Sequence, residues 1–256
     1  SKKDRPALSK LVLAVATVII AIGLVLSFTR AAWVSLAGAG ALFIAMKIGI
    51  KLKTLASISV LIVMAALVNF ESLMIDLQRN KQDSSDNLTE HVQSISNVSS
   101  DDSNLERLNR WSCAVSLFKE RPIVGWGPGT YQFVYAPFQK SELKTGISTN
   151  NADGGNAHSE YLGPLAEQGV LGVLWVLLLI LWASVVGFRL WNNLEKKDER
   201  NLAASIYLGL MTYFIHGVLN NYLDTDKASA PFWGFLALLV VLDIESRRNS
   251  LPKSAA

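Results

Sequence analysis

Apolar and polar residues are gathered along this chain in long blocks, without the short periods of a soluble helix or strand. Six apolar blocks are of membrane length or close to it, and in chain order they cover 11–28, 31–50, 54–70, 170–188, 202–222 and 231–244. As a helix, the first spans roughly 27 Å, close to a hydrocarbon core of about 30 Å. The sixth is short and is expected to tilt little or to span only part of the bilayer. The pattern predicts an all-α integral membrane protein with about six membrane helices.

Basic residues are concentrated before block one, between blocks two and three, between blocks four and five, and after block six. Because basic connections stay on the cytoplasmic side, both ends of the chain are predicted to be cytoplasmic. Residues 1–70 then hold three membrane helices. Residues 71–169 form a large outward-facing polar region that carries the candidate catalytic residues. Residues 170–256 hold three further membrane helices and a cytoplasmic tail.

Composition narrows the classes of function. Half of the 256 residues are hydrophobic and the formal net charge is only +3, which argues against a nucleic-acid partner. A single cysteine, Cys113, excludes an intramolecular disulfide and a cysteine-based metal cluster. No second histidine or cysteine stands at metal-ligand spacing, and there is no serine-hydrolase signature. We therefore expect no metal site.

The outward-facing region has two parts that differ in amino-acid composition and in the spacing of apolar residues. Residues 80–104 are rich in Ser, Asn and Asp and are expected to form a flexible or irregular loop. From Leu105, apolar residues at helical spacing predict a short amphipathic helix that ends before Pro122. A turn rich in glycine and proline, 125–130, is then expected to lead into an extended aromatic segment, 131–135.

Four outward-facing arginines are candidate ligands for an anion. Arg30 stands in the turn between the first two blocks, where it either snorkels to lipid headgroups or grips a phosphate with its planar fork. Arg107 and Arg110 lie three residues apart and share a face of the predicted helix, and Arg121 follows at the helix end. The alternative for these three is a solvated basic face with glutamates nearby.

His158 is the sharpest candidate for proton transfer, because a histidine titrates near neutral pH and can take a proton from a sugar hydroxyl. It follows a glycine-rich loop, NNADGGNAH, and is expected to open a helix. His91 lies in the polar tract and is interpreted as incidental. His216 lies inside block five, where we favour a packed, hydrogen-bonded role. Glu160 and Glu167 either orient His158 or cap the helix.

Three segments, taken together, resemble the O-antigen ligase and polymerase superfamily. HSEYLGPLAEQGVLG matches the family signature of His, then Asn, Ser or Gln, nine residues, Gly, two residues and Gly, through His158, Ser159, Gly169 and Gly172. SFTRAAWVSLAG is similar to the family's arginine helix start, with Thr29 for Ser and Ala31 for Gly. ERLNRWSCAVSLFKERPIVGWGPGTY resembles the family's Arg-Leu-x-x-Trp and Pro-x-x-Gly-x-Gly-x-Gly segment, with Gly125, Gly127 and Gly129.

The resemblance covers about 11–245 and corresponds to the C-terminal half of a usual member, a GT-C-like half. It implies a glycosyltransferase of the bacterial inner membrane that moves a glycan from undecaprenyl pyrophosphate to an acceptor at the periplasmic face. Arg30 and Arg107 would bind the pyrophosphate and His158 would activate the acceptor hydroxyl, without metal or nucleotide cofactor. We add Arg110 and Arg121 as further pyrophosphate ligands. Lipid A core is the favoured acceptor, which makes O-antigen ligation the favoured reaction.

Other readings stay open. An O-antigen polymerase and a protein O-oligosaccharyltransferase differ from the ligase in acceptor and share its donor chemistry. A polysaccharide permease or channel would line several helices with charge at mid-membrane, whereas this sequence places its charges at the outer ends. A structural membrane subunit would use the outer polar residues only to bind a partner.

Overall fold

The computed structural model describes residues 7–27, 29–69, 102–146, 148–149 and 155–250. The described helices are α1 (Ala7–Leu26), α2 (Arg30–Lys47), α3 (Leu52–Val68), α6 (Asp102–Glu120), α7 (Tyr131–Val134), α8 (Leu162–Asn193), α9 (Lys197–His216) and α10 (Asp226–Ser250), with two 3-10 turns at Ala136–Phe138 and Ser141–Leu143. The described residues form no strand, which confirms the all-α prediction. The loop expected at 80–104 lies outside the described residues up to 101, and so does His91.

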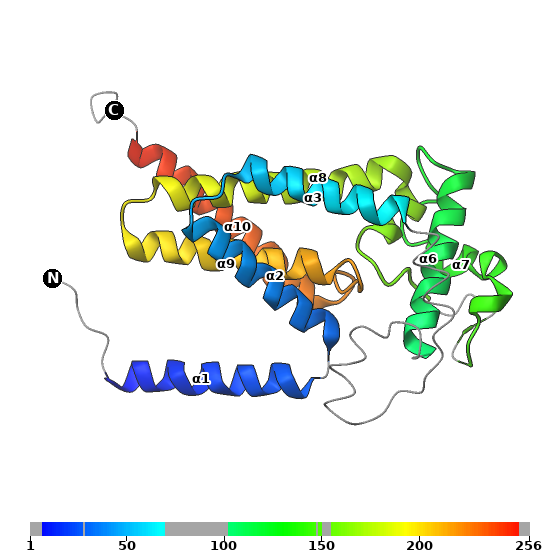
Figure 1. The fold of residues 1–256 in the computed structure, drawn as a ribbon, viewed down its shortest axis with the longest axis horizontal. Helices are drawn as coiled ribbons and strands as arrows, with labels where there is room; N and C mark the ends of the chain where they lie inside the picture. The colour runs from blue at the N-terminus through cyan, green and yellow to red at the C-terminus, as the bar shows by residue number, and fades with distance from the viewer. Residues whose placement is uncertain (1–6, 28, 70–101, 147, 150–154, 251–256) are drawn as a thin grey trace.

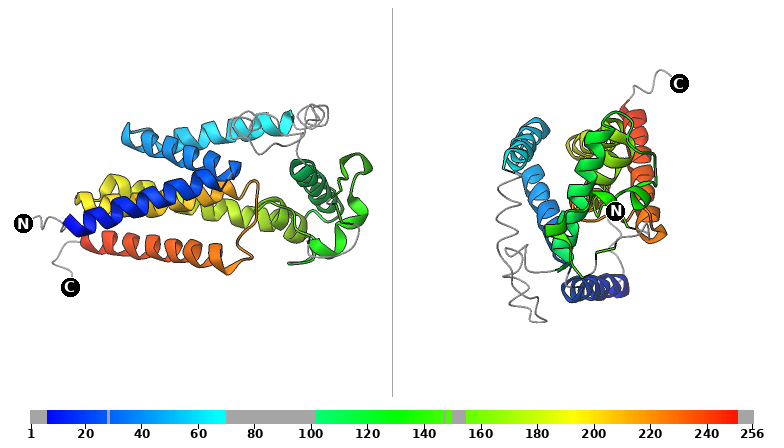
Figure 2. Two further views of the ribbon diagram at one scale, coloured as in Figure 1. Left: turned by 90° about the horizontal axis from the view of Figure 1, so that it is seen from below. Right: turned by 90° about the vertical axis from the view of Figure 1, so that its right-hand side faces the viewer.

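An elongated bundle of α2, α3, α8, α9 and α10 carries α6 and α7 across one end (Figure 1). The α2–α3 and α8–α9 connections, which hold basic residues, lie at the other end, where α1 begins and α10 ends (Figures 1 and 2). The amphipathic helix α6 and the start of α8 are therefore separated from the basic connections by the length of the bundle. Alternating membrane crossings would produce this segregation.

Three helices among the described residues are long and apolar enough to cross a bilayer: α1, α8 and α10. The shorter α3 is apolar over Leu52–Ala65. Most large apolar side chains of α1, from Leu8 to Leu26, are exposed, as expected of a helix surrounded by hydrocarbon. The protein is thus an all-α membrane protein, and the expected count of six crossings stays a prediction.

Three helices differ from the blocks that the sequence predicts. The helix α8 covers Leu162–Asn193 and so extends beyond its apolar block, 170–188, at both ends. α10 has 25 residues, so the expectation of a short sixth helix over 231–244 is wrong. Asp243 accepts a hydrogen bond from Arg247 Nε at 3.0 Å, and this pair, one helical turn apart, extends α10 beyond its apolar part. α9 ends at His216, before the end of block five, because the carbonyl of Gly217 accepts a hydrogen bond from the backbone N–H of Glu160 at 2.8 Å.

The main core lies where α8, α9 and α10 meet, and Tyr207, Leu210 and Leu239 are almost completely buried there. Glycines let these helices approach closely. A Cβ added at Gly187 would lie 2.5 Å from the ring of Tyr207. A second, smaller core of α6, α7 and the start of α8 includes Tyr135. This second core holds the outer end of α8 against α6.

Candidate functional site

A kink at Gly169 shapes the outer end of α8. Its φ of 65° and ψ of −153° belong to a region that only glycine adopts readily. The kink turns the backbone N–H of Val170 toward the carbonyl of Pro122, 2.8 Å away. A Cβ at Gly169 would lie 2.4 Å from the carbonyl oxygen of Ile123. A Cβ at Gly172 would lie 2.6 Å from the carbonyl oxygen of Pro164. Gly172 therefore leaves room for the turn of α8 before the kink, which the kink brings close to it.

The glycine-rich segment after α6 packs on this kink backbone to backbone. A Cβ at Gly125 would lie 2.3 Å from the carbonyl carbon of Glu167. The N–H of Trp126 donates to the carbonyl of Ala166 at 3.2 Å, and that of Gly127 donates to Glu167 at 2.7 Å. The Gly-x-Gly-x-Gly segment and the start of α8 therefore form one interface, which fixes α6 relative to α8.

The side chain of Glu167 caps the N-terminus of α7. Its two carboxylate oxygens accept the backbone N–H groups of Gly129 and Tyr131, each at 2.9 Å. The first N–H groups of a helix have no partner within the helix, so a carboxylate supplied by another element stabilises a helical turn here. The expectation of an extended aromatic segment over 131–135 is wrong for this reason. Glu167 caps a helix, but the helix is α7 and not its own.

His158 lies in a turn before α8, so the expectation that it opens the helix is wrong. Its φ is 47°, in the left-handed region, and it has the only positive φ among the described residues other than glycine. The side-chain oxygen of Asn156 accepts the His158 N–H at 3.0 Å and holds this conformation. Ser159 then accepts the N–H groups of Tyr161 and Leu162 at 3.3 and 3.4 Å, so it caps the first turn of α8.

The surroundings of His158 keep its imidazole neutral. Burial first, and then the positive charges of Arg107 and Arg110, lower the pKa of His158 to about 4, while Glu106 opposes them. The two arginines three residues apart on α6 therefore both act on His158. At neutral pH the ring holds an unprotonated nitrogen that can accept a proton.

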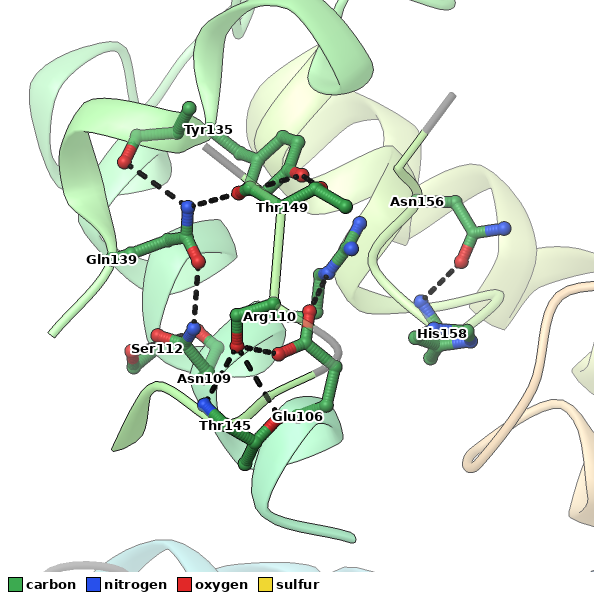
Figure 3. A network of polar contacts seen from close by, with 12 residues as sticks. Glu106, Asn109, Arg110, Ser112, Tyr135, Gln139, Thr145, Thr149, Asn156 and His158 are labelled. Carbon is green, nitrogen blue, oxygen red and sulfur yellow. Dashed lines mark hydrogen bonds and ion pairs between the residues drawn. The ribbon is translucent and has the colours of Figure 1, made fainter. Parts of the chain in front are cut away.

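Arg110 is buried and belongs to a polar network between α6 and the following loop (Figure 3). Its Nε donates to Glu106 at 2.6 Å, and its guanidinium lies 4.5 Å from the ring centre of Tyr135. Nη1 has no hydrogen-bond partner among the described residues. A Cβ at Gly155 would lie 1.9 Å from Nη1, so the loop that leads to His158 passes directly over this nitrogen. The charge of Arg110 is thus largely matched by Glu106.

The other three arginines occupy different places. Arg107 is half-buried, and its charge acts on both His158 and His216. Arg30 is half-buried at the first position of α2, and the next turn of that helix lines a cavity with His216. Arg121 is exposed, with its guanidinium 4.0 Å from the Trp126 ring, and lies roughly 20 Å along α6 from Arg107.

Glu160 ties the turn that holds His158 to the connection between α9 and α10. Its Oε1 accepts the hydroxyl of Tyr213 at 2.5 Å and the N–H of Leu223 at 3.0 Å. Burial raises the pKa of Glu160, and these two hydrogen bonds oppose the rise. Because its partners are neutral, Glu160 acts as a structural acceptor that positions the outer end of α9 beside His158.

Two cavities adjoin this region. One of about 410 Å³ lies between α2, α9 and α10; its walls are apolar, and His216, Tyr213 and Tyr222 are among its few polar residues. The other, of about 400 Å³, is polar and follows the first two turns of α8. Its lining includes four side-chain amides, from Gln132, Asn156, Gln168 and Asn221, and no basic residue within the part of the chain that the structure describes. The two cavities thus suit ligands of opposite character.

Four residues that organise this region have roles that sequence reasoning did not assign: Glu106, Asn156, Glu160 and Glu167. Only the pairing of Glu106 with Arg110 has a local signal, the spacing of four residues on a helix. The other contacts join segments that tertiary packing brings together, or depend on one turn. Among the described residues, no group of three His, Cys, Asp or Glu side chains could hold a metal ion.

His158, Arg107 and Arg110 form a histidine–arginine cluster at the outer end of the bundle. The fold and this cluster define a helical membrane protein with a polar site at one end of its bundle. The family model described as O-antigen ligase matches residues 15–177, which include α6 and the turn that carries His158. The chain belongs to the O-antigen ligase family, as the resemblance predicts. Membership indicates glycan transfer of the O-antigen ligase or polymerase type. No curated protein and no solved structure matches the chain significantly.

Proposed function

We propose that this protein transfers a glycan from undecaprenyl pyrophosphate to an acceptor hydroxyl, with lipid A core as the favoured acceptor. The observation that carries the proposal is His158, a neutral imidazole held in a fixed turn beside the charges of Arg107 and Arg110. A base and a cationic anion-binding group side by side suit a reaction that removes a proton from one substrate and releases a pyrophosphate from the other.

In the proposed step, the acceptor oxygen attacks the anomeric carbon of the donor glycan. The bond between that carbon and the pyrophosphate oxygen breaks, and the electron pair leaves with undecaprenyl pyrophosphate. The unprotonated ring nitrogen of His158 takes the hydroxyl proton and later releases it to water. Arg107 and Arg30 stabilise the negative charge that develops on the leaving group. The buried Arg110, paired with Glu106, contributes mainly through its field and by shaping the loop.

Donor binding would also activate the base. A histidine whose pKa lies near 4 is a weak base at neutral pH. When the pyrophosphate binds Arg107, its negative charge offsets the positive charge that lowers the pKa of His158. The pKa of His158 should then rise toward its usual range, so the base gains strength only once the donor is in place. Such coupling would limit proton transfer when no donor is present.

The two cavities suit the two halves of a lipid-linked sugar. The apolar cavity beside His216 would take a stretch of polyprenyl chain, with the pyrophosphate at Arg107 above it. The polar cavity beside Asn156 would take sugar rings, because amides donate to and accept from hydroxyl groups. Family membership and the basic connections at the far end of the bundle support a site at the periplasmic face of a bacterial inner membrane.

The test is transfer by the full-length protein in detergent or nanodiscs, with a defined undecaprenyl-pyrophosphate glycan as donor. Lipid A core, free glycan and a protein acceptor are offered in parallel, which separates ligase, polymerase and protein glycosylation. We expect His158→Ala to lower transfer by at least about a hundredfold with unchanged insertion into the membrane, because general-base catalysis contributes roughly a hundred- to ten-thousandfold.

His91→Ala, the same change at a histidine of the polar tract, is the matched control and should retain transfer. Transfer by His158→Ala at the wild-type rate would refute the base role. Absence of transfer to all three acceptors by the wild-type protein would refute the reaction itself.

A further inference from the structure

A further cavity lies at the end of the bundle opposite His158. Its volume is about 980 Å³, and it is lined by α2, α9 and Trp191 near the end of α8. Toward the α2–α3 and α8–α9 connections, its lining includes three basic residues, Lys47, Lys197 and Arg200. Farther along α2 and α9 the lining is apolar or small, as at Leu36, Ala39, Gly40 and Leu208. The cavity is therefore amphipathic along its length.

The basic end is organised by two aromatic rings. Phe43 and Trp191 meet edge to face with ring centres 6.0 Å apart. The ammonium of Lys47 lies 4.8 Å from the Phe43 ring, and the guanidinium of Arg200 lies 5.3 Å from that of Trp191. A hydrogen bond of 3.2 Å from Trp191 Nε1 to the Met46 carbonyl fixes the indole. The cations are thus held by aromatic faces, which leave their charge uncompensated.

The acidic residue directly before Arg200 is directed away from the cavity. Glu199 directly precedes Arg200 in the sequence but pairs with Lys196, 2.7 Å away, and neither Glu199 nor Lys196 lines the cavity. No acidic side chain is among the residues described as lining it. The Nε atom of Arg200 is buried and has no hydrogen-bond partner among the described residues. An anion at this end would therefore satisfy both the charge and an orphaned donor.

The length of the apolar cavity wall indicates which kind of anion the cavity would bind. From Lys47 to Leu36, α2 rises about 16 Å, and half of a hydrocarbon core of about 30 Å is about 15 Å. The apolar wall is therefore about as long as one leaflet is deep, with the basic cluster where headgroups would lie. Basic pockets between membrane helices on the cytoplasmic side are a known way of binding anionic lipid headgroups.

We propose that this cavity binds an anionic phospholipid, with its phosphate at Lys47, Lys197 and Arg200 and an acyl chain along α2 and α9. The basic end of this site shares no residue with the histidine–arginine cluster, although its apolar end shares Leu36, Gly209 and Thr212 with the apolar cavity near His216. Lipid binding at the basic end can therefore be tested without an assay of glycan transfer. An inorganic phosphate could meet the charge, but it would leave the apolar wall uncovered.

The experiment uses the full-length protein in detergent and counts bound lipids by native mass spectrometry. Phosphatidylglycerol and phosphatidylcholine with identical acyl chains are offered together, and inorganic phosphate is added in a separate arm. The test variant is Lys47→Gln with Lys197→Gln, and the control is Lys51→Gln with Lys53→Gln. All four lysines are exposed and expected on the same side, so the two variants lose equal charge, but only the first pair lines the cavity.

We expect the wild type and the control to retain phosphatidylglycerol in preference to phosphatidylcholine, and the test variant to lose roughly tenfold or more of that preference. Equal loss in both variants would reduce the effect to general surface charge and overturn the site. Displacement by phosphate at matched concentration would overturn the lipid in favour of a simple anion site. Binding of neither lipid would mean that a polypeptide segment covers the cavity, which also overturns the proposal.

Discussion

The glycines at the two ends of α8 allow close approach to different kinds of atoms. At the outer end, Gly169 and the facing Gly125 press against backbone atoms of Ile123 and Glu167. At the inner end, Gly187 presses against the ring of Tyr207. A side chain can move or be shortened by mutation, whereas a backbone carbonyl held by hydrogen bonds cannot.

This difference separates a region that sets geometry from a region that provides packing. The outer end of α8 holds α6, α7 and the His158 turn in one arrangement through backbone contacts and the carboxylates of Glu160 and Glu167. The inner end buries apolar surface against α9 and α10. Mutations at the outer end should therefore remove function without rescue, and those at the inner end should be open to compensation.

The largest effect is expected from Gly169→Ala. The substitution forces a Cβ into a glycine-only backbone region and to within 2.4 Å of a carbonyl oxygen, so we expect a loss of about 2 to 5 kcal/mol in stability and of transfer. Thermal unfolding in detergent, followed by size-exclusion chromatography, measures the first, and the transfer assay measures the second.

Gly23→Ala in α1 is the control, because nothing lies within 4 Å of the added Cβ there. It should be neutral or slightly stabilising. Wild-type stability in Gly169→Ala would mean that the kink is not required, and the contrast between the two ends of α8 would lose its basis.

A smaller effect is expected from Gly187→Ala, which places a Cβ 2.5 Å from the Tyr207 ring. Overpacking of this kind costs about 1 to 3 kcal/mol. In a double-mutant cycle, Tyr207→Leu should recover part of this loss, so that the two changes together cost less than their sum. Strict additivity would show that the ring does not cause the loss.

The smallest effect is expected from Glu160→Gln, because an amide oxygen can accept the same two hydrogen bonds from Tyr213 and Leu223. The pKa of Glu160 is raised above 4.5 in the folded protein, so its contribution to stability is complete below that pH and is lost as the pH rises through the raised value. The stability of the wild type relative to Glu160→Gln should therefore fall from about pH 4.5 upward.

Asp243, a buried acidic residue near the inner end of the bundle, provides the matched comparison for Glu160. Asp243 forms ion pairs with Arg189 and Arg247. Asp243→Asn removes the carboxylate from both cations and should lower the free energy of unfolding by about 1 to 3 kcal/mol near neutral pH. Melting temperatures of both variants between pH 5 and pH 8 test the pair. A larger loss in Glu160→Gln than in Asp243→Asn at pH 7 would contradict the assignment of Glu160 as a structural acceptor with uncharged partners.

The fold class follows from local pattern, and the exceptions have physical causes. Long apolar blocks and the periodicity after Leu105 predict α1, α2, α3 and α6 closely, because hydropathy and helical spacing are local properties, whereas α8 extends beyond its block at both ends. The end of α9 and the start of α7 depend on carboxylates and N–H groups from other parts of the chain. The helix α10 extends beyond its apolar block because charged residues can continue a helix outside the hydrocarbon core.

The candidate site divides in the same way. The spacing of Arg107 and Arg110 on one helix face predicts that they act together, and the structure brings both toward His158. The distance of Arg121 from Arg107 follows from the length of α6, which the sequence also predicts. The left-handed turn of His158 does not follow, because it depends on the particular hydrogen bond that the Asn156 side chain accepts. The partner of Glu167 does not follow either, because packing of the segment after α6 on α8 brings the two together.

The central claim is that His158 is a neutral base whose proton affinity is set by burial and by the arginines of α6. The chain has three histidines, so labelled-histidine NMR can assign the imidazole of His158 by comparison with His158→Ala. A titration of the detergent-solubilised protein should give a pKa for His158 of about 4, which inorganic pyrophosphate or Arg107→Ala should raise. A pKa near 6.5 that responds to neither change would contradict the account.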